Sequence, residues 1–229
     1  MKRFYKEAAA VPTDGTVAVL LDGRAVKTPA RNPLAVPTEE LAEAIAEEWN
    51  YQGEEIDPRT MPLTGLANAA IDRVSPDPQA FARGLAAYGE SDLLCYRSEG
   101  PQELVRRQEA AWDSILHWAR RRFDVDFALA CGVMHRPQPE STTRRLAEAV
   151  AVHDPFRLAA LSPLVTISGS LVIALALAEG EIGLEQAWAA ATLDEAWQAE
   201  QWGEDALAVQ ALAARRRDFE AAYRFLTLL

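Results

Sequence analysis

Acidic and indole side chains gather in residues 193–205, a stretch that contains no Lys or Arg. Its carboxylates and indoles are those of Asp194, Glu195, Glu200, Glu204 and Asp205, with Trp197 and Trp202. Carboxylates beside indoles can anchor an Arg or Lys of another protein, because aromatic residues dominate interface energetics and carboxylates pair with guanidinium groups. The stretch is therefore a candidate protein-binding surface.

Two other interpretations of this stretch stay open from the residues alone. One helix could end at Gly203 and a second begin there, with Glu204 and Asp205 stabilised at its positive end. Two carboxylates among Asp194, Glu200 and Glu204 could instead act as general acid and base of a hydrolase or lyase. That enzymatic alternative needs an environment that separates two carboxyl pKa values, and nothing in the sequence supplies one.

Other catalytic and cofactor signatures are missing from the sequence. It has neither a Gly-x-x-x-x-Gly-Lys-Ser/Thr phosphate loop nor a Gly-x-Gly-x-x-Gly turn. His117, His135 and His153 lack the spacing of metal ligands on adjacent turns. Ser170 lies outside a Gly-x-Ser-x-Gly pattern, and we expect it to serve helix packing. The sequence thus predicts no cofactor, no metal and no catalytic residue.

Charge and cysteine content narrow the classes of partner. The 229 residues carry 23 basic and 34 acidic side chains, a net charge of −11. Such a surface repels phosphate backbones and anionic lipids, so neither nucleic acid nor a membrane is an expected partner.

Cys95 and Cys131 are too few for a disulfide scaffold, and we expect both thiols to be buried. No secretory signal opens the sequence, which favours the cytoplasm.

The first 59 residues read as a small α+β domain. Two β-prone runs over residues 16–28 flank Asp22-Gly23, a dipeptide that favours a type I′ hairpin turn. Thr38 is a typical helix N-cap, and the apolar stripe that follows it predicts a helix that ends near Gly53. Residues 47–56 carry several acids, which we expect on a solvated face. Pro58 and Pro62 mark the end of the domain.

Residues 60–229 read as a larger all-α domain, because apolar residues recur there with a helical period. Long helices are expected near residues 101–123, 141–152, 184–202 and 205–226. Residues 158–178 carry no charge and are long enough for a membrane span. Their first half is polar, however, so we expect one buried central helix and no membrane insertion. The predicted fold class is multi-domain α and β.

Several ordered segments resemble the ATP12 family, the assembly chaperones of the F1 part of ATP synthase. The matching segments are residues 3–6, 21–24, 27–29, 48–49, 52–54, 61–64, 66–68, 71–73, 92–97, 107–108, 112–113, 169–171 and 202–205. The likeness runs nearly from end to end in the same order. It is the ordered combination, rather than any one block, that makes the resemblance specific.

The resemblance implies a non-enzymatic chaperone of bacterial type, with mitochondrial-matrix relatives in eukaryotes. Its implied client is the unassembled F1-ATPase α subunit, which it would keep from aggregating and hand to the β subunit. The implied fold has a small mixed domain and a helical one. The family's important acidic position falls on Glu204, with Asp205 beside it and with Trp202 and Glu200 in the same partner-binding stretch.

Overall fold

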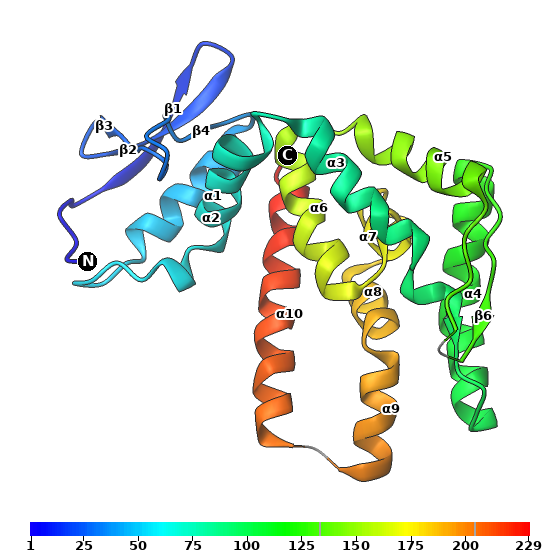
Figure 1. Cartoon of the computed structure of the whole chain (residues 1–229). Coiled ribbons are helices and arrows are strands. Elements are labelled where there is room, and N and C mark those ends of the chain that lie inside the picture. Colours follow the sequence, from blue (N-terminus) through cyan, green and yellow to red (C-terminus); the bar gives the residue numbers. More distant parts are fainter. Residues whose placement is uncertain (133, 204) are drawn as a thin grey trace. The chain divides into compact units, whose positions relative to one another are not determined.

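The computed structural model describes residues 1–132, 134–203 and 205–229, which form two compact units (Figure 1). The first unit comprises Met1–Pro78, Asp154–Ala160 and Ala221–Leu229, and the second comprises Gln79–His153 and Leu161–Glu220. The expected fold class is confirmed, with the main sheet near the N-terminus and helices dominating the rest. The expected division into a domain of residues 1–59 and a domain of residues 60–229 stays a prediction.

The sheet of the first unit is built around one central strand. Strand β2 (Thr16–Leu21) pairs antiparallel with β1 (Ala8–Thr13), β3 (Arg24–Ala25) and β4 (Ala35–Val36). Asp22 and Gly23 have φ angles of 46° and 77°, which is the geometry of the type I′ turn that the sequence predicts. Strand β3 ends at Ala25 rather than continuing to residue 28.

Helix α1 (Glu39–Asn50) packs against β1 and β2 and buries Leu41 and Ile45. The Thr38 side chain accepts from the Leu41 amide, so the predicted N-cap is confirmed. The helices that follow in this part of the chain are η1 (Pro58–Thr60), α2 (Pro62–Ala69) and η2 (Ala70–Val74, a π-helical turn).

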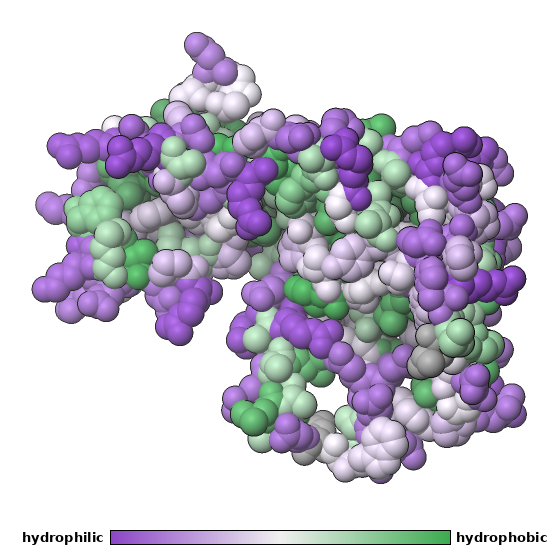
Figure 2. Space-filling view, in the orientation of Figure 1, coloured by the Kyte–Doolittle hydropathy of each residue, from purple (hydrophilic) through white to green (hydrophobic). Residues whose placement is uncertain are grey.

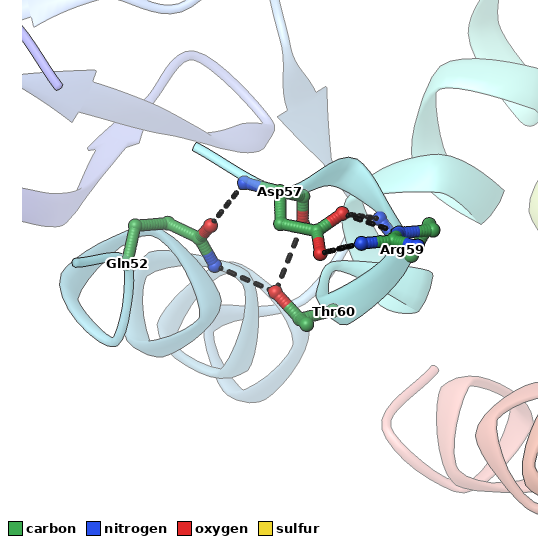
Figure 3. Close-up of polar contacts among 4 residues, drawn as sticks. All are labelled: Gln52, Asp57, Arg59 and Thr60. Carbon is green, nitrogen blue, oxygen red and sulfur yellow. Dashed lines mark hydrogen bonds and ion pairs between the residues drawn. The ribbon is translucent and has the colours of Figure 1, made fainter. Parts of the chain in front are cut away.

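A polar brace holds the segment between α1 and α2 (Figure 3). The Gln52 Oε1 accepts from the Asp57 amide at 2.8 Å, and its Nε2 donates to Thr60 Oγ1 at 3.0 Å. Asp57 caps η1 and pairs with Arg59 at 2.7 Å, and the hydrogen bonds from Arg59 lower the pKa of Asp57 to about 2. These hydrogen bonds hold the chain in place where the acid-rich 47–56 stretch leads into η1.

Glu48 corrects the expectation of a solvated acidic face. Its carboxylate accepts from the amides of Leu63 and Thr64 at 2.7 and 2.8 Å, and from Thr64 Oγ1 at 2.7 Å. These amides lie in the first turn of α2, where backbone donors have no partner within the helix. Burial raises the pKa of Glu48, although the Thr64 and Leu63 hydrogen bonds oppose that rise. Glu48 is therefore the N-terminal cap of α2, supplied by α1.

The remaining elements are mainly helical. Their bounds are α3 (Pro78–Ala86), η3 (Ala87–Glu90), η4 (Leu93–Cys95), α4 (Gln102–Phe123), α5 (Glu140–Ala151), α6 (Pro155–Ser168), α7 (Leu171–Ala178), α8 (Leu184–Ala191), α9 (Leu193–Trp202) and α10 (Ala206–Thr227). One short parallel pair interrupts them, β5 (Tyr96–Arg97) with β6 (Ala130–Cys131), which the all-α expectation did not include. Cys95 is buried, and burial raises its pKa to about 12, whereas Cys131 is exposed, contrary to expectation.

The uncharged 158–178 stretch forms two helices instead of one. The chain turns at Gly169, which has a φ of +67°, and Ser170 then caps α7. All residues from Leu171 to Leu177 are buried, so the expected burial is confirmed. None of the helices in the described residues combines the length and apolarity that a bilayer crossing requires.

A buried carboxylate holds the start of α7. Asp92 Oδ1 accepts from Ser170 Oγ at 2.7 Å and from the Leu94 amide at 3.1 Å, and Oδ2 accepts from the Val172 amide at 3.0 Å. Burial raises the Asp92 pKa to about 6, although these donors favour the charged form. Ser170 is therefore the N-cap of α7, a hydrogen-bonding role that differs from the expected one in helix packing.

Candidate partner-binding site

The acid- and indole-rich stretch forms α9 and one wall of a groove. The expected helix over residues 184–202 is divided at Thr192, which has φ −111° and ψ 13° and whose hydroxyl donates to Trp188 O at 2.8 Å, into α8 and α9. Helix α9 then packs on α4. A groove of about 630 Å³ lies between α9, the start of α4 and residues 96–101, and its lining includes both Trp197 and Trp202.

Arg107 of α4 holds the C-terminal half of α9. Its Nη1 donates to both carboxylate oxygens of Glu200, at 2.9 and 2.8 Å. The Arg107 guanidinium carbon also lies 4.7 Å from the centre of the Trp197 ring, within cation–π range. The hydrogen bonds to Glu200 raise the pKa of Arg107. Glu200 is thus paired with another residue of the protein and lies on α9, the helix that forms one wall of the groove.

Gln108 of α4 holds the first turn of α9. Its buried amide donates through Nε2 to Asp194 Oδ1 at 2.8 Å, and its Oε1 accepts from the Ser98 amide at 2.8 Å. Helix α9 and the segment that follows β5 are therefore tied to the same residue of α4. Sequence reasoning placed Arg107 and Gln108 in a family motif and did not assign them this role.

The end of α9 presents an exposed indole to the groove. Trp202 is 79% exposed, and Gly203 ends the helix with a φ of +85° while its amide donates to Ala199 O at 2.9 Å. The predicted helix end at Gly203 is therefore confirmed. Asp205 accepts from the Ala208 amide at 3.2 Å in the first turn of α10. Glu204, the residue on which the family's acidic position falls, lies outside the described residues.

The carboxylates of this stretch do not assemble into a reactive pair among the residues that the structure describes. Asp194 faces a glutamine amide, Glu200 a guanidinium and Asp205 a backbone amide. The described chain also contains no group of three or more His, Cys, Asp or Glu side chains that could hold a metal ion. The hydrolase or lyase alternative gains no geometric support from Asp194 or Glu200.

Comparison with known proteins settles the family. The profile of the ATP12 chaperone protein family matches residues 2–120. The chain belongs to the ATP12 chaperone family. Its protein relatives include mitochondrial atp12 of Schizosaccharomyces pombe, which is 26% identical over 214 residues, covering 88% of this chain and 74% of the relative.

Solved structures extend the family likeness over the whole fold. The crystal structure of Atp12 from Paracoccus denitrificans matches with a TM-score of 0.94 and 42% identity, covering 99% of this chain and 97% of that one. A protein of Agrobacterium tumefaciens matches with a TM-score of 0.95 and 43% identity, over 99% of this chain and 85% of its own. The ATP12 fold and family inferred from the sequence are both confirmed.

Membership also decides between the broad classes of function. An ATP12 protein is an F1-ATPase assembly chaperone rather than an enzyme. Its relatives occur both in bacteria and in a yeast mitochondrion. The enzymatic alternative is therefore set aside.

Proposed function

We propose that this ATP12 protein binds the unassembled α subunit of F1-ATPase, prevents its aggregation and delivers it for assembly with the β subunit. The observation that carries the proposal is Trp202, an indole left 79% exposed at the mouth of the α9 groove. Burying a large aromatic side chain against a partner gives a favourable binding free energy, and such residues dominate the energetics of protein interfaces.

The lining of the groove fits an apolar side chain with a basic neighbour. Trp197, Leu104 and Pro101 supply apolar surface, while Asp194 and Glu99 place carboxylates in the same lining. Within this proposal Trp202 contacts the client directly, and Glu200 positions α9 through Arg107. Glu204 and Asp205 add acidic charge next to the indole in the sequence.

The proposed cycle needs no nucleotide. A lone ring subunit exposes the apolar face that its neighbour will later cover, and such faces aggregate. A chaperone that covers the face with moderate affinity is displaced when the true neighbour buries more surface. Such a cycle fits the cytoplasm of a bacterium, where the subunits of F1 meet.

Co-expression tests the proposal. The F1 α subunit is produced alone, with this protein, and with an unrelated acidic protein of similar size. We expect more soluble α subunit, and a co-purifying complex, only with this protein. A parallel expression with the β subunit is the matched control for the client. Equal solubility of α in all three cultures, with no co-purifying band, contradicts the proposal.

A further inference from the structure

The first half of α10 departs from the pattern of the other helices. Residues 206–214 read Ala-Leu-Ala-Val-Gln-Ala-Leu-Ala-Ala, with no charge. A helix that is apolar on all sides is normally buried, as α7 is in this protein. Here residues 206–211 are all exposed, and Leu207 and Val209 expose 73% and 44% of their surface. We call residues 206–214 the α10 tip.

The α10 tip is held as a helix although little packs against it. Ala-rich sequence favours helix, and Asp205 accepts from the Ala208 amide in the first turn. Further along, Arg215 pairs with Glu195 of α9 at 2.8 Å, and Arg216 pairs with Glu185 of α8 at 2.6 Å. Figure 2 shows apolar surface at the N-terminal end of α10 and open space between it and α9.

The charge around the α10 tip indicates which kind of partner surface would be complementary to it. From residue 193 to residue 214 the sequence holds five acids and no Lys or Arg, and only Glu195 and Glu200 of these acids form ion pairs among the described residues, with Arg215 and Arg107. Two copies of this chain joined through their tips would bring two acid-rich stretches together, which costs electrostatic free energy. A partner with an apolar patch bordered by Lys or Arg would instead meet complementary charge.

We infer that the α10 tip is a second client-docking surface, separate from the groove, which covers an apolar patch bordered by basic side chains on the F1 subunit client. This inference rests on the proposed function, because that function supplies the client. Exposed apolar surface of this kind marks interaction sites in soluble proteins. With α9 on one side and the α10 tip on the other, the client would contact both helices at once.

The test replaces the two exposed side chains without touching the groove. The double variant Leu207→Gln/Val209→Gln is compared with the unaltered protein and with Val152→Gln. Val152 is the matched control, because it is an 80% exposed aliphatic residue at the end of α5. Affinity for purified F1 α subunit is measured by titration, and thermal unfolding and sedimentation velocity are recorded for all three proteins.

We expect the double variant to bind the α subunit about tenfold more weakly or worse, with the unfolding midpoint unchanged and Val152→Gln behaving as the unaltered protein. If the unaltered protein and the double variant bind α equally, the inference is wrong while the proposed function stands. If the unaltered protein does not bind α, the proposed function itself fails. If it sediments as a dimer that the double variant dissociates, a second copy covers the tip and the inference is overturned.

Discussion

Arg107 donates from one nitrogen to both carboxylate oxygens of Glu200, and this pair joins α4 to α9. The two residues are 93 positions apart in the chain, so the contact positions α9 relative to the start of α4. That position defines one wall of the groove beside Trp197. Within the proposed function we assign Glu200 to holding α9, while its direct contact with a partner, expected from the sequence, stays a prediction.

Exchanging the two charges tests this assignment. Glu200→Lys places a cation against Arg107, so we expect weaker binding of the α subunit. The double exchange Arg107→Glu/Glu200→Lys restores the pair with its polarity reversed, and should recover most of the binding. Titration calorimetry with purified α subunit measures both. Binding by the double exchange as weak as that of Glu200→Lys would instead show that the client needs the Glu200 carboxylate.

Trp202→Ala separates binding from stability. Because the indole is largely exposed, we expect the free energy of unfolding to change by less than about 0.5 kcal/mol. Binding of the α subunit should weaken by about tenfold or more, as for an aromatic interface anchor. Urea denaturation and titration with the client measure the two effects.

Tyr51→Ala is the matched control for Trp202, because Tyr51 is a 92% exposed aromatic residue remote in sequence from α9. It should change neither stability nor client binding. Equal binding losses in the two variants would remove the special role assigned to Trp202.

Asp92 predicts an unusual dependence of stability on pH. Burial raises its pKa from 3.8 to about 6, so between these values the folded protein binds more protons than the unfolded chain. The contribution of Asp92 to stability is therefore greatest below pH 4 and falls as the pH rises to 6, by about 3 kcal/mol. Above pH 6 it is constant.

Asp92→Asn removes this titration and so isolates it. We expect the free energy of unfolding of the unaltered protein, minus that of Asp92→Asn, to decrease from pH 4 to pH 7. Urea denaturation at several pH values measures the difference. A difference that rises with pH would mean that the Ser170 and backbone donors outweigh burial.

Glu48→Gln tests the cap that α1 supplies to α2. The amide oxygen can still accept from one of the Leu63 and Thr64 amides, but its NH2 group places a donor against the other, so we expect a loss of about 1–3 kcal/mol in the free energy of unfolding. Glu47→Gln is the control, because the neighbouring Glu47 side chain is 72% exposed. Comparable losses in both variants would show that the α2 cap does not matter.

Local signals predicted much of the fold. The Asp22-Gly23 turn and the Thr38 cap depend on residues next to one another, and both were placed correctly. The break at Thr192 was missed because no Pro or Gly marks it and the apolar pattern continues through it. Strand β1 was missed because Ala-rich sequence has little β-propensity, and it is the pairing with β2 that orders it.

Long-range polar contacts could not be predicted from sequence patterns. Glu48 caps a helix that begins 14 residues later, and Asp92 meets Ser170 across 78 positions. Both belong to segments that carry the ATP12 resemblance. Some of the segments that make the family recognisable therefore serve as helix caps, whereas the α10 tip lies outside all of them.

Light scattering after size-exclusion chromatography of purified α subunit mixed with this protein tests the central claim most directly. The account predicts a stoichiometric complex that keeps the α subunit from aggregating and that disappears when β subunit is added and α–β assemblies form. Two separate peaks, with the α subunit aggregating at the same rate as it does alone, would contradict it.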